Sequence, residues 1–212
     1  MADCGLPTSM TTVSSVTESL FQRGSQYQQF RPTYPPSLFQ WLSNQSTGHH
    51  LALDLGCGSG QASRGLITVA QAYHWFDQAA FHAEAQRTLC PGGMLALISY
   101  GVCEVTGLGS MIQDFHDGPL APWWPPERAQ VVAGYPDADL PWPALTYPGD
   151  CITLDWSATD MLGYLDTWSA LVQAARTGEH PLDDFAPTLR QAWGDGLRTV
   201  HWPLRVRAWR KQ

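Results

Sequence analysis

The feature that most constrains the fold is a short apolar run that ends in closely spaced glycines. Residues 51–60 read LALDLGCGSG, so a segment suited to a buried strand leads directly into Gly56, Gly58 and Gly60. Glycines allow a sharp turn and let the backbone approach a ligand closely. A helix that begins after such a turn presents free N–H groups to negative or polar ligand groups. The arrangement therefore predicts a site for a nucleotide-like cofactor at a strand-to-helix turn.

Two further apolar runs have the length of buried strands, and helical segments are predicted between them. Asp77 is suited to cap the second of these helices, and Pro91-Gly92-Gly93 ends it. The predicted elements are strands over 51–55, 67–72 and 94–99 and helices over 61–66 and 78–89. This alternation predicts an α/β fold with a doubly wound, mostly parallel sheet, in which the first strand lies beside the second.

The rest of the chain is predicted to complete a single domain over residues 17–212, after a disordered lead over 1–16. A stretch rich in proline and tryptophan, residues 118–149, is predicted to be a lid, because a long loop in a compact domain usually covers a site. The other predicted elements are a helix over 37–44, a strand over 152–156, a helix over 159–176 and a strand over 199–209. Pro203 favours an edge position for that last strand.

The composition limits the classes of partner and site. The formal net charge of -7 argues against nucleic acid and anionic membranes as partners, since both need a basic surface. The five cysteines are odd in number and form no CxxC, and the seven histidines form no HExxH, so the sequence predicts neither a disulfide framework nor a metal site. We expect a cytoplasmic protein that acts on a small molecule; the oligomeric state is open.

The spacing GxGxG differs from the GxGxxG of dinucleotide-binding proteins, and it resembles the first motif of class I S-adenosylmethionine-dependent methyltransferases. Four further segments resemble the small-molecule branch of that family, the methyltransferase type 11 and trans-aconitate methyltransferase-like proteins. They are QFRPTYP (29–35), TVAQAYHWFD (68–77), LCPGGM (89–94) and YLDTWSA (164–170). The resemblance implies S-adenosylmethionine as the cofactor and a Rossmann-like fold with a C-terminal lid.

The resemblance also implies roles for individual residues. The glycines Gly56, Gly58 and Gly60 would hold the methionine and ribose part of the cofactor. The other predicted cofactor-binding residues are Asp54 in the first strand, Gln71 after the second strand, and Arg31 and Tyr34, which would close over the methionine carboxylate. His74 and Trp75 would border the acceptor site, and no residue is assigned as a certain catalytic group.

Each of these side chains also has an alternative role without a ligand. Arg31 could pair with a surface carboxylate, Tyr34 could pack against the Pro35-Pro36 turn, and His74 and Trp75 could be structural. The Trp123-Trp124 pair could belong to the core of the lid or form a wall for the substrate.

One part of the family pattern has no counterpart. In the family two strand–helix units follow the glycine helix, and they supply an acidic residue for the ribose and a contact for the adenine. Here Leu66 runs directly into Ile67, which indicates an internal deletion of roughly 40 residues or more.

The expected function is methyl transfer from S-adenosylmethionine to a small molecule, with a carboxylate or similar oxygen nucleophile as the acceptor. A truncated, inactive family member with weak or no cofactor binding is one alternative. A nicotinamide-dependent oxidoreductase is a second alternative. The GxGxG spacing disfavours it, as does the lack of an acid about 20 residues beyond the turn.

Overall fold

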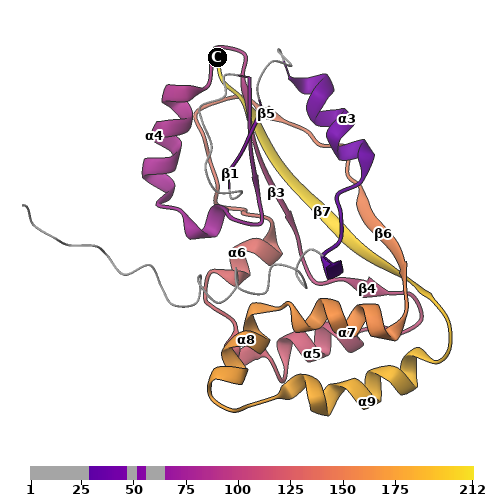
Figure 1. Cartoon of the computed structure of the whole chain (residues 1–212). Coiled ribbons are helices and arrows are strands. Elements are labelled where there is room, and N and C mark those ends of the chain that lie inside the picture. Colours follow the sequence, from indigo (N-terminus) through magenta and orange to yellow (C-terminus); the bar gives the residue numbers. More distant parts are fainter. Residues whose placement is uncertain (1–28, 47–51, 56–64) are drawn as a thin grey trace, which may run out of the picture.

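The computed structural model describes residues 29–46 and 65–212, and the backbone of residues 52–55 between them. Its centre is a twisted sheet in which strands β1 (Ala52–Leu55), β2 (Leu66–Ala70) and β3 (Met94–Tyr100) lie side by side and parallel (Figure 1). The register pairs Leu53 with Ile67, and Ile67 with Leu95. The prediction of three adjacent parallel strands, with the first beside the second, is therefore confirmed.

The two faces of the sheet are covered by different helices, and the alternation of side chains along β3 shows this division. Leu95 and Leu97 join a buried cluster with α4 (Gln78–Thr88) and α6 (Arg128–Ala133). Ala96 and Ile98 point to the other face, where α3 (Pro36–Gln45) packs. Every residue of β3 is buried, as expected for a strand covered on both faces. The structure thus has the Rossmann-like α/β architecture that the sequence predicts.

A group of helices lies beyond the end at which β3 finishes (Figure 1). Its members are α5 (Met111–Asp117), α7 (Ala158–Asp166), α8 (Ser169–Arg176) and α9 (Pro181–Trp193). Trp168 and Trp193 of this group are almost completely buried, together with Trp202 of the sheet. The large aromatic side chains therefore fasten the helical group to the carboxyl end of the sheet.

Strand β7 (Arg198–Arg210) occupies the interior of the sheet, so the prediction of an edge strand is wrong. It pairs antiparallel with β3, β4 (Glu104–Val105), β5 (Ala144–Leu145) and β6 (Cys151–Trp156). Pro203 is tolerated because it falls between the stretch paired with β3, which begins at Leu204, and the stretch paired with β4, which ends at His201. The missing proline N–H is thus located where the neighbouring strand changes.

The predicted helix over 159–176 is in fact two helices, because the chain becomes extended at Trp168. The hydroxyl of Thr167 donates to the carbonyl of Tyr164 at 2.6 Å, which satisfies a carbonyl at the end of α7. The carbonyl of Thr167 in turn accepts a hydrogen bond from Arg31 at 3.1 Å. A local and a long-range hydrogen bond thus meet at the break, and a helical pattern does not reveal the long-range one.

Some of the remaining predicted elements are confirmed, and others cannot be compared with the structure because they lie outside the described residues. The helices at 37–44 and 78–89, the strand at 152–156 and the N-cap role of Asp77, which accepts from the N–H of Ala80, are confirmed. The lead over 1–16, the glycine turn and residues 61–64 of the predicted helix over 61–66 lie outside the described residues. The last two residues of that helix are described and are not helical, since Gly65 lies in a bend and Leu66 begins β2. Among the described residues, no helix is long and apolar enough to cross a membrane.

Residues 118–149, predicted as a lid, fold into the 3-10 turn η2 (Ala121–Trp123), α6 and β5. Val131, Tyr135 and Leu140 of this segment are buried against the face of the sheet that α4 covers. The part from Val131 to Trp142 therefore packs on the sheet, whereas Trp123 and Trp124 near the beginning of the segment stay partly exposed.

Candidate functional site

Gln71 stands at the carboxyl end of β2 in a backbone conformation that residues other than glycine seldom adopt, with a φ of 55°. Its N–H donates to the carbonyl of Ile98 at 2.9 Å, and its side-chain amide approaches the carbonyl of Tyr100 at 3.4 Å. Such strain is held in place by surrounding contacts and is common at ligand sites. The conformation turns the chain out of β2 at the edge where open α/β sheets bind ligands.

The segment 29–35 reaches the same edge from a distant part of the sequence. Arg31 donates to the carbonyl of Thr167 at 3.1 Å and lies 3.5 Å from the hydroxyl of Tyr100, the last residue of β3. Its guanidinium also lies over the ring of Tyr164, 5.6 Å from the centroid. Tyr34 packs against Tyr100 with ring centroids 6.2 Å apart. Arg31 and Tyr34 are thus placed together at the end of β3.

His74 and Trp75 belong to the 3-10 turn η1 (Tyr73–Trp75), which follows Gln71. Nδ1 of His74 is 3.2 Å from the hydroxyl of Tyr135, and the His74 ring contacts Trp75 at a centroid distance of 4.5 Å. Trp75 is 53% exposed, which excludes a role for it in the core. The structure therefore keeps Trp75 accessible while His74 is tied to the layer that covers the sheet.

The pKa of His74 is lowered from its usual value of 6.5 to about 4. Burial is the largest cause, and the positive charge of Arg128 adds to it, whereas Glu127 acts in the opposite direction. Burial also raises the pKa of the Tyr135 hydroxyl. Both side chains are therefore neutral near pH 7, and the pair exchanges a hydrogen bond without carrying charge.

Arg128 is a site residue that the sequence reading missed. It begins α6, and its guanidinium lies over the ring of Trp124 at 4.9 Å from the centroid. Burial lowers its pKa, Tyr164 raises it, and the nearby Arg31 lowers it again. The sequence did offer one signal for this residue, which is a single basic side chain within a stretch rich in tryptophan and proline. The sequence could not show that the stretch folds back over the ends of β2 and β3.

Some predicted site residues cannot be placed in this geometry. Gly56, Gly58 and Gly60 lie outside the described residues, and only the backbone of Asp54 is described, paired with Thr68 of β2. The structure therefore brings Arg31, Tyr34, Gln71 and His74 to one edge of the sheet and leaves the glycine turn undescribed. Within the described part of the chain, no group of histidine, cysteine and acidic side chains could hold a metal ion.

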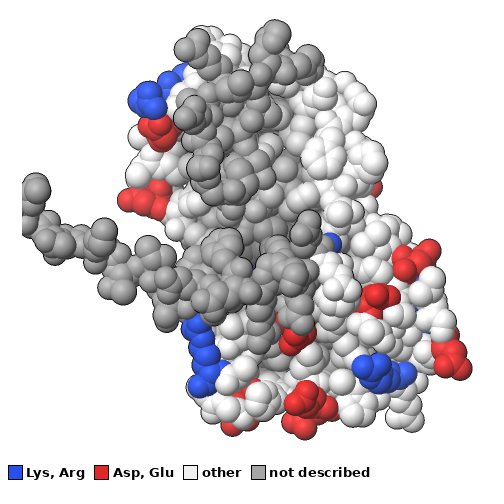
Figure 2. Space-filling view, viewed as in Figure 1, with Lys and Arg blue, Asp and Glu red and all other residues white. Residues whose placement is uncertain are grey.

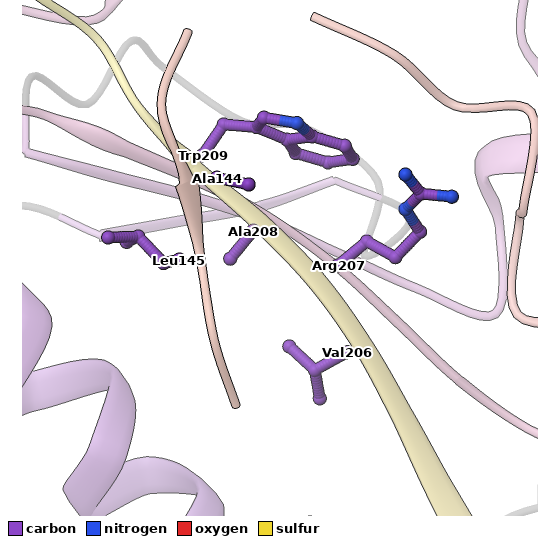
Figure 3. Close-up of a pocket in the computed structure, with 6 residues that line it drawn as sticks. All are labelled: Ala144, Leu145, Val206, Arg207, Ala208 and Trp209. Atoms are coloured by element: carbon purple, nitrogen blue, oxygen red, sulfur yellow. The ribbon is translucent and has the colours of Figure 1, made fainter. Parts of the chain in front are cut away.

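A separate small pocket of about 150 Å³ lies where β5 meets β7, away from these residues (Figure 3). It is lined by Ala144, Leu145, Val206, Arg207, Ala208 and Trp209. The guanidinium of Arg207 lies 5.5 Å from the ring of Trp209 and donates to the carbonyl of Tyr135 at 3.1 Å. Because its only charged group is already engaged, this pocket is not the candidate site.

Charged side chains are sparse on the face of the molecule shown in Figure 2. Among the described residues visible there, acidic and basic groups are scattered and no broad basic area is formed. This distribution agrees with the acidic composition of the whole chain. It gives no support to a nucleic-acid surface on that face.

A Rossmann-like sheet with polar groups gathered at its carboxyl edge is an architecture shared by many enzymes, and the comparisons with known proteins specify the family. No protein-family model matches the chain. A solved structure described as a "putative type II methyltransferase" from Anaeromyxobacter dehalogenans is 35% identical and superposes with a TM-score of 0.76, covering 85% of this chain and 98% of its own. A Dictyostelium discoideum protein named "putative methyltransferase" is 27% identical, over 84% of this chain and 89% of its own length. The chain belongs to the class I methyltransferases.

Proposed function

We propose that this methyltransferase uses S-adenosylmethionine to methylate a small molecule that offers a carboxylate or similar oxygen nucleophile. The observation that carries the proposal is the meeting of Arg31, Tyr34 and Gln71 around Tyr100 at the carboxyl end of β3. These residues come from two segments separated in sequence, and both segments resemble the family. The cofactor would supply an electrophilic methyl group on a sulfonium.

The donor set fits the methionine end of this cofactor. Arg31 offers a planar guanidinium suited to a carboxylate, and it is positioned by the carbonyl of Thr167 and the ring of Tyr164. Gln71 offers an amide at the end of β2, where its backbone is held in a strained conformation. Tyr34 would add an apolar ring beside them. The glycine turn, by family resemblance, would complete this half of the site.

The adenosine half has fewer groups to hold it among the described residues. Asp77 is the only acid in residues 71–77 that follow β2, and its carboxylate already accepts from Ala80. The alignment with the Dictyostelium protein extends over 234 residues, more than the 212 residues of this chain. That relative therefore carries residues opposite gaps in this chain. The gaps support the inferred loss of two strand–helix units, and with them the ribose carboxylate.

The acceptor side of the site suits a nucleophile that is already ionised. His74 has a pKa of about 4, so it is neutral near pH 7 and is engaged with Tyr135. A carboxylate needs no proton removed before it attacks a methyl group. The protein would then contribute mainly by aligning the carboxylate oxygen with the methyl carbon and excluding water. His74 and Trp75 would border this space without acting as acid or base.

The alternative is a family member that has lost activity together with the missing units. Titration of the whole chain with S-adenosylhomocysteine, followed by calorimetry, distinguishes the two. We expect weak but measurable binding that falls roughly ten- to hundredfold in Arg31→Met, because a charged hydrogen bond is lost. Arg87→Met is the matched control, since Arg87 is exposed and paired with Glu84 on α4.

A methyl-transfer assay completes the test. Labelled S-adenosylmethionine is incubated with the chain and a panel of small carboxylic acids, and the methyl ester is measured. Ester formation supports the proposal. Absence of binding to S-adenosylhomocysteine in the parent chain would favour the inactive alternative. Equal binding by Arg31→Met would refute the role of Arg31 in holding the methionine carboxylate.

A further inference from the structure

His116 is a buried histidine in which one ring nitrogen has no hydrogen-bond partner among the described residues. Its side chain is 8% exposed near the end of α5, and its Nδ1 lies 2.6 Å from the carboxylate of Asp117. Hydrogen bonds from Gln113 and His116 lower the pKa of Asp117, so this carboxyl is ionised near pH 7. Because an ionised carboxylate only accepts hydrogen bonds, Nδ1 carries the proton of the neutral ring. The buried Nε2 is therefore an unprotonated acceptor that no described donor reaches.

Two tryptophan rings enclose this histidine. Trp124 lies against the ring of His116 with centroids 4.5 Å apart and an angle of 30° between the planes. Trp168 contacts the ring at 5.6 Å and 83°, and the two indoles contact each other at 5.4 Å. The indole N–H of Trp124 also donates to the main-chain carbonyl of His116 at 3.0 Å. His116 is thus the point at which α5, the residues after η2 and the start of α8 meet.

The enclosure has no place for a second proton on His116. That proton would be added to Nε2, and the new N–H would be buried without a described acceptor. Arg128 and Asp117 are the charged groups that act on the ring, and Trp168 faces it without a charge. Burial is the largest effect, and together with Arg128 it outweighs the opposite effect of Asp117, so the pKa of His116 is lowered.

Trp124 is the wall of the enclosure that can move with the smaller loss of buried surface. Trp168 is 2% exposed, whereas Trp124 stays partly exposed. Displacement of Trp124 would bring Nε2 of His116 into contact with water, which supplies the missing acceptor. The displacement would give up the hydrogen bond to the carbonyl of His116 and the stacking of the Trp124 ring on Arg128. Protonation of the histidine and retention of Trp124 in its present position therefore oppose each other.

We propose that protonation of His116 releases Trp124 and the turn η2 from α5 and α8, so that this segment is a pH-sensitive cover. The released histidine is hydrated and titrates near 6.5, whereas the pKa of the enclosed histidine is lower. The released state therefore binds more protons below pH 6.5, and each pH unit below this value favours it by up to about tenfold.

The cover lies next to the candidate cofactor site. Trp168, which Trp124 contacts, packs against Tyr164, and the guanidinium of Arg31 lies over the ring of Tyr164. Release of Trp124 would remove one support of this group of rings, and we expect weaker binding of the cofactor at low pH. This consequence rests on the proposed function, whereas the release itself does not.

Hydrogen exchange of main-chain amides in the whole chain tests the release. The N–H of Leu120 donates to the carbonyl of Phe115 at 3.2 Å, and the N–H of Trp123 donates to the carbonyl of Leu120 at 3.0 Å. Leu97, in the middle of β3, is the internal reference. The chemical step of exchange depends on pH in the same way at each amide, so the ratio of rates isolates the opening. Between pH 7.5 and pH 5.5 the ratio of Leu120 and Trp123 to Leu97 should rise by up to about tenfold.

Matched variants separate the histidine from other titrating groups. His116→Phe keeps a ring between the two tryptophans and cannot be protonated, so the ratio should be the same at both pH values. His180→Gln is the control, because His180 is exposed before α9, and it should behave as the parent chain does. A ratio that does not change with pH in the parent chain, or that rises equally in His116→Phe, would overturn the proposal.

A second readout needs no variant. NMR of the parent chain at pH 7.5 should show the His116 ring protonated on Nδ1, and a ring protonated on Nε2 would contradict the proposal. Calorimetry with S-adenosylhomocysteine then tests the consequence for the cofactor, since affinity should fall from pH 7.5 to pH 5.5 by a larger factor in the parent chain than in His116→Phe. Absence of binding at both pH values would refute the proposed function, whereas the exchange ratios alone decide the release.

Discussion

Strands β1 and β7 differ strongly in how the described structure supports them. β1 has four residues, and in the described part of the chain it pairs only with β2. β7 has 13 residues and pairs with β3, β4, β5 and β6. Trp202 and Trp209 of β7 are buried, one on each face of the sheet. The strand that leads to the predicted cofactor turn thus has one described neighbour, whereas the strand beside the predicted acceptor region has four.

The difference suggests that folding and cofactor binding depend on separate parts of the molecule. Changes near β7 should unfold the chain, because they remove large buried surfaces. Changes near β1 should alter cofactor affinity while the rest of the sheet persists. Four predictions test this separation, and they are ordered from the largest to the smallest expected change in the free energy of binding or unfolding.

The largest expected effect comes from restoring the two inferred strand–helix units between Leu66 and Ile67, with the segment of the Dictyostelium relative as the donor. A ribose-binding carboxylate and an adenine contact together contribute roughly 4–7 kcal/mol, since charged hydrogen bonds are worth about 1.5–3 kcal/mol each. Affinity for S-adenosylhomocysteine should therefore rise on the order of a thousandfold, as measured by calorimetry. If the parent chain already binds with a low micromolar dissociation constant, the missing units are not needed.

The second effect concerns the well-supported region. Trp202 is fully buried and forms edge contacts with Trp156 and Tyr164 at centroid distances of 4.8 and 5.5 Å. Trp202→Ala should lower the free energy of unfolding by about 3–5 kcal/mol, the usual cost of such a truncation. Trp75→Ala is the control, because Trp75 is 53% exposed. Urea unfolding that shows equal losses for both variants would mean that β7 is not the stabilising centre.

The third effect is a pH dependence that arises from His74. Its pKa is about 4 in the folded chain and near 6.5 when unfolded, so the unfolded state binds more protons between these values. Stability should therefore fall as the pH drops from 6.5 to 4. One pKa unit corresponds to about 1.4 kcal/mol, and partial exposure reduces the total to about 1–3 kcal/mol. In His74→Gln the loss of stability between pH 7 and pH 4.5 should be smaller, and an unchanged loss would exclude His74 as its source.

The smallest effect concerns Asp77, which caps α4 through the N–H of Ala80. Asp77→Ala should lower the unfolding free energy by about 1 kcal/mol, as loss of an N-cap usually does. Binding of S-adenosylhomocysteine should not change, because the carboxylate is used by the helix. Thermal unfolding and calorimetry on one variant measure both quantities. A marked loss of affinity would show that Asp77 substitutes for the missing ribose acid.

The parallel part of the sheet was predictable from sequence because each strand is a short apolar run followed by a turn. The position of β7 in the sheet was not predictable, because an alternating pattern of side chains does not specify which strands pair with it. Pro203 was interpreted as an edge signal, whereas it lies in the interval between two partner strands. Likewise the carbonyl before the break at Trp168 accepts a hydrogen bond from Arg31, which is far away in the sequence.

The candidate site shows the same limit. Arg31, Tyr34, Gln71 and His74 were found through family resemblance, and the structure brings them to one edge. Arg128 was not predicted as a site residue, because only the side chains packed around it in the folded chain distinguish it. The stacking of its guanidinium on Trp124 is a property of the folded chain, and no spacing of residues expresses it.

The place of β7 in the sheet also has a consequence for synthesis of the protein. β7 follows every other described element in the sequence, yet β3, β4, β5 and β6 all pair with it. While the chain emerges from the ribosome, these four strands are synthesised before the strand with which they all pair. Their apolar faces stay exposed during that interval, which is when chaperones bind and aggregation competes with folding. The yield of native protein should accordingly depend on how fast β7 is translated after the strands that pair with it.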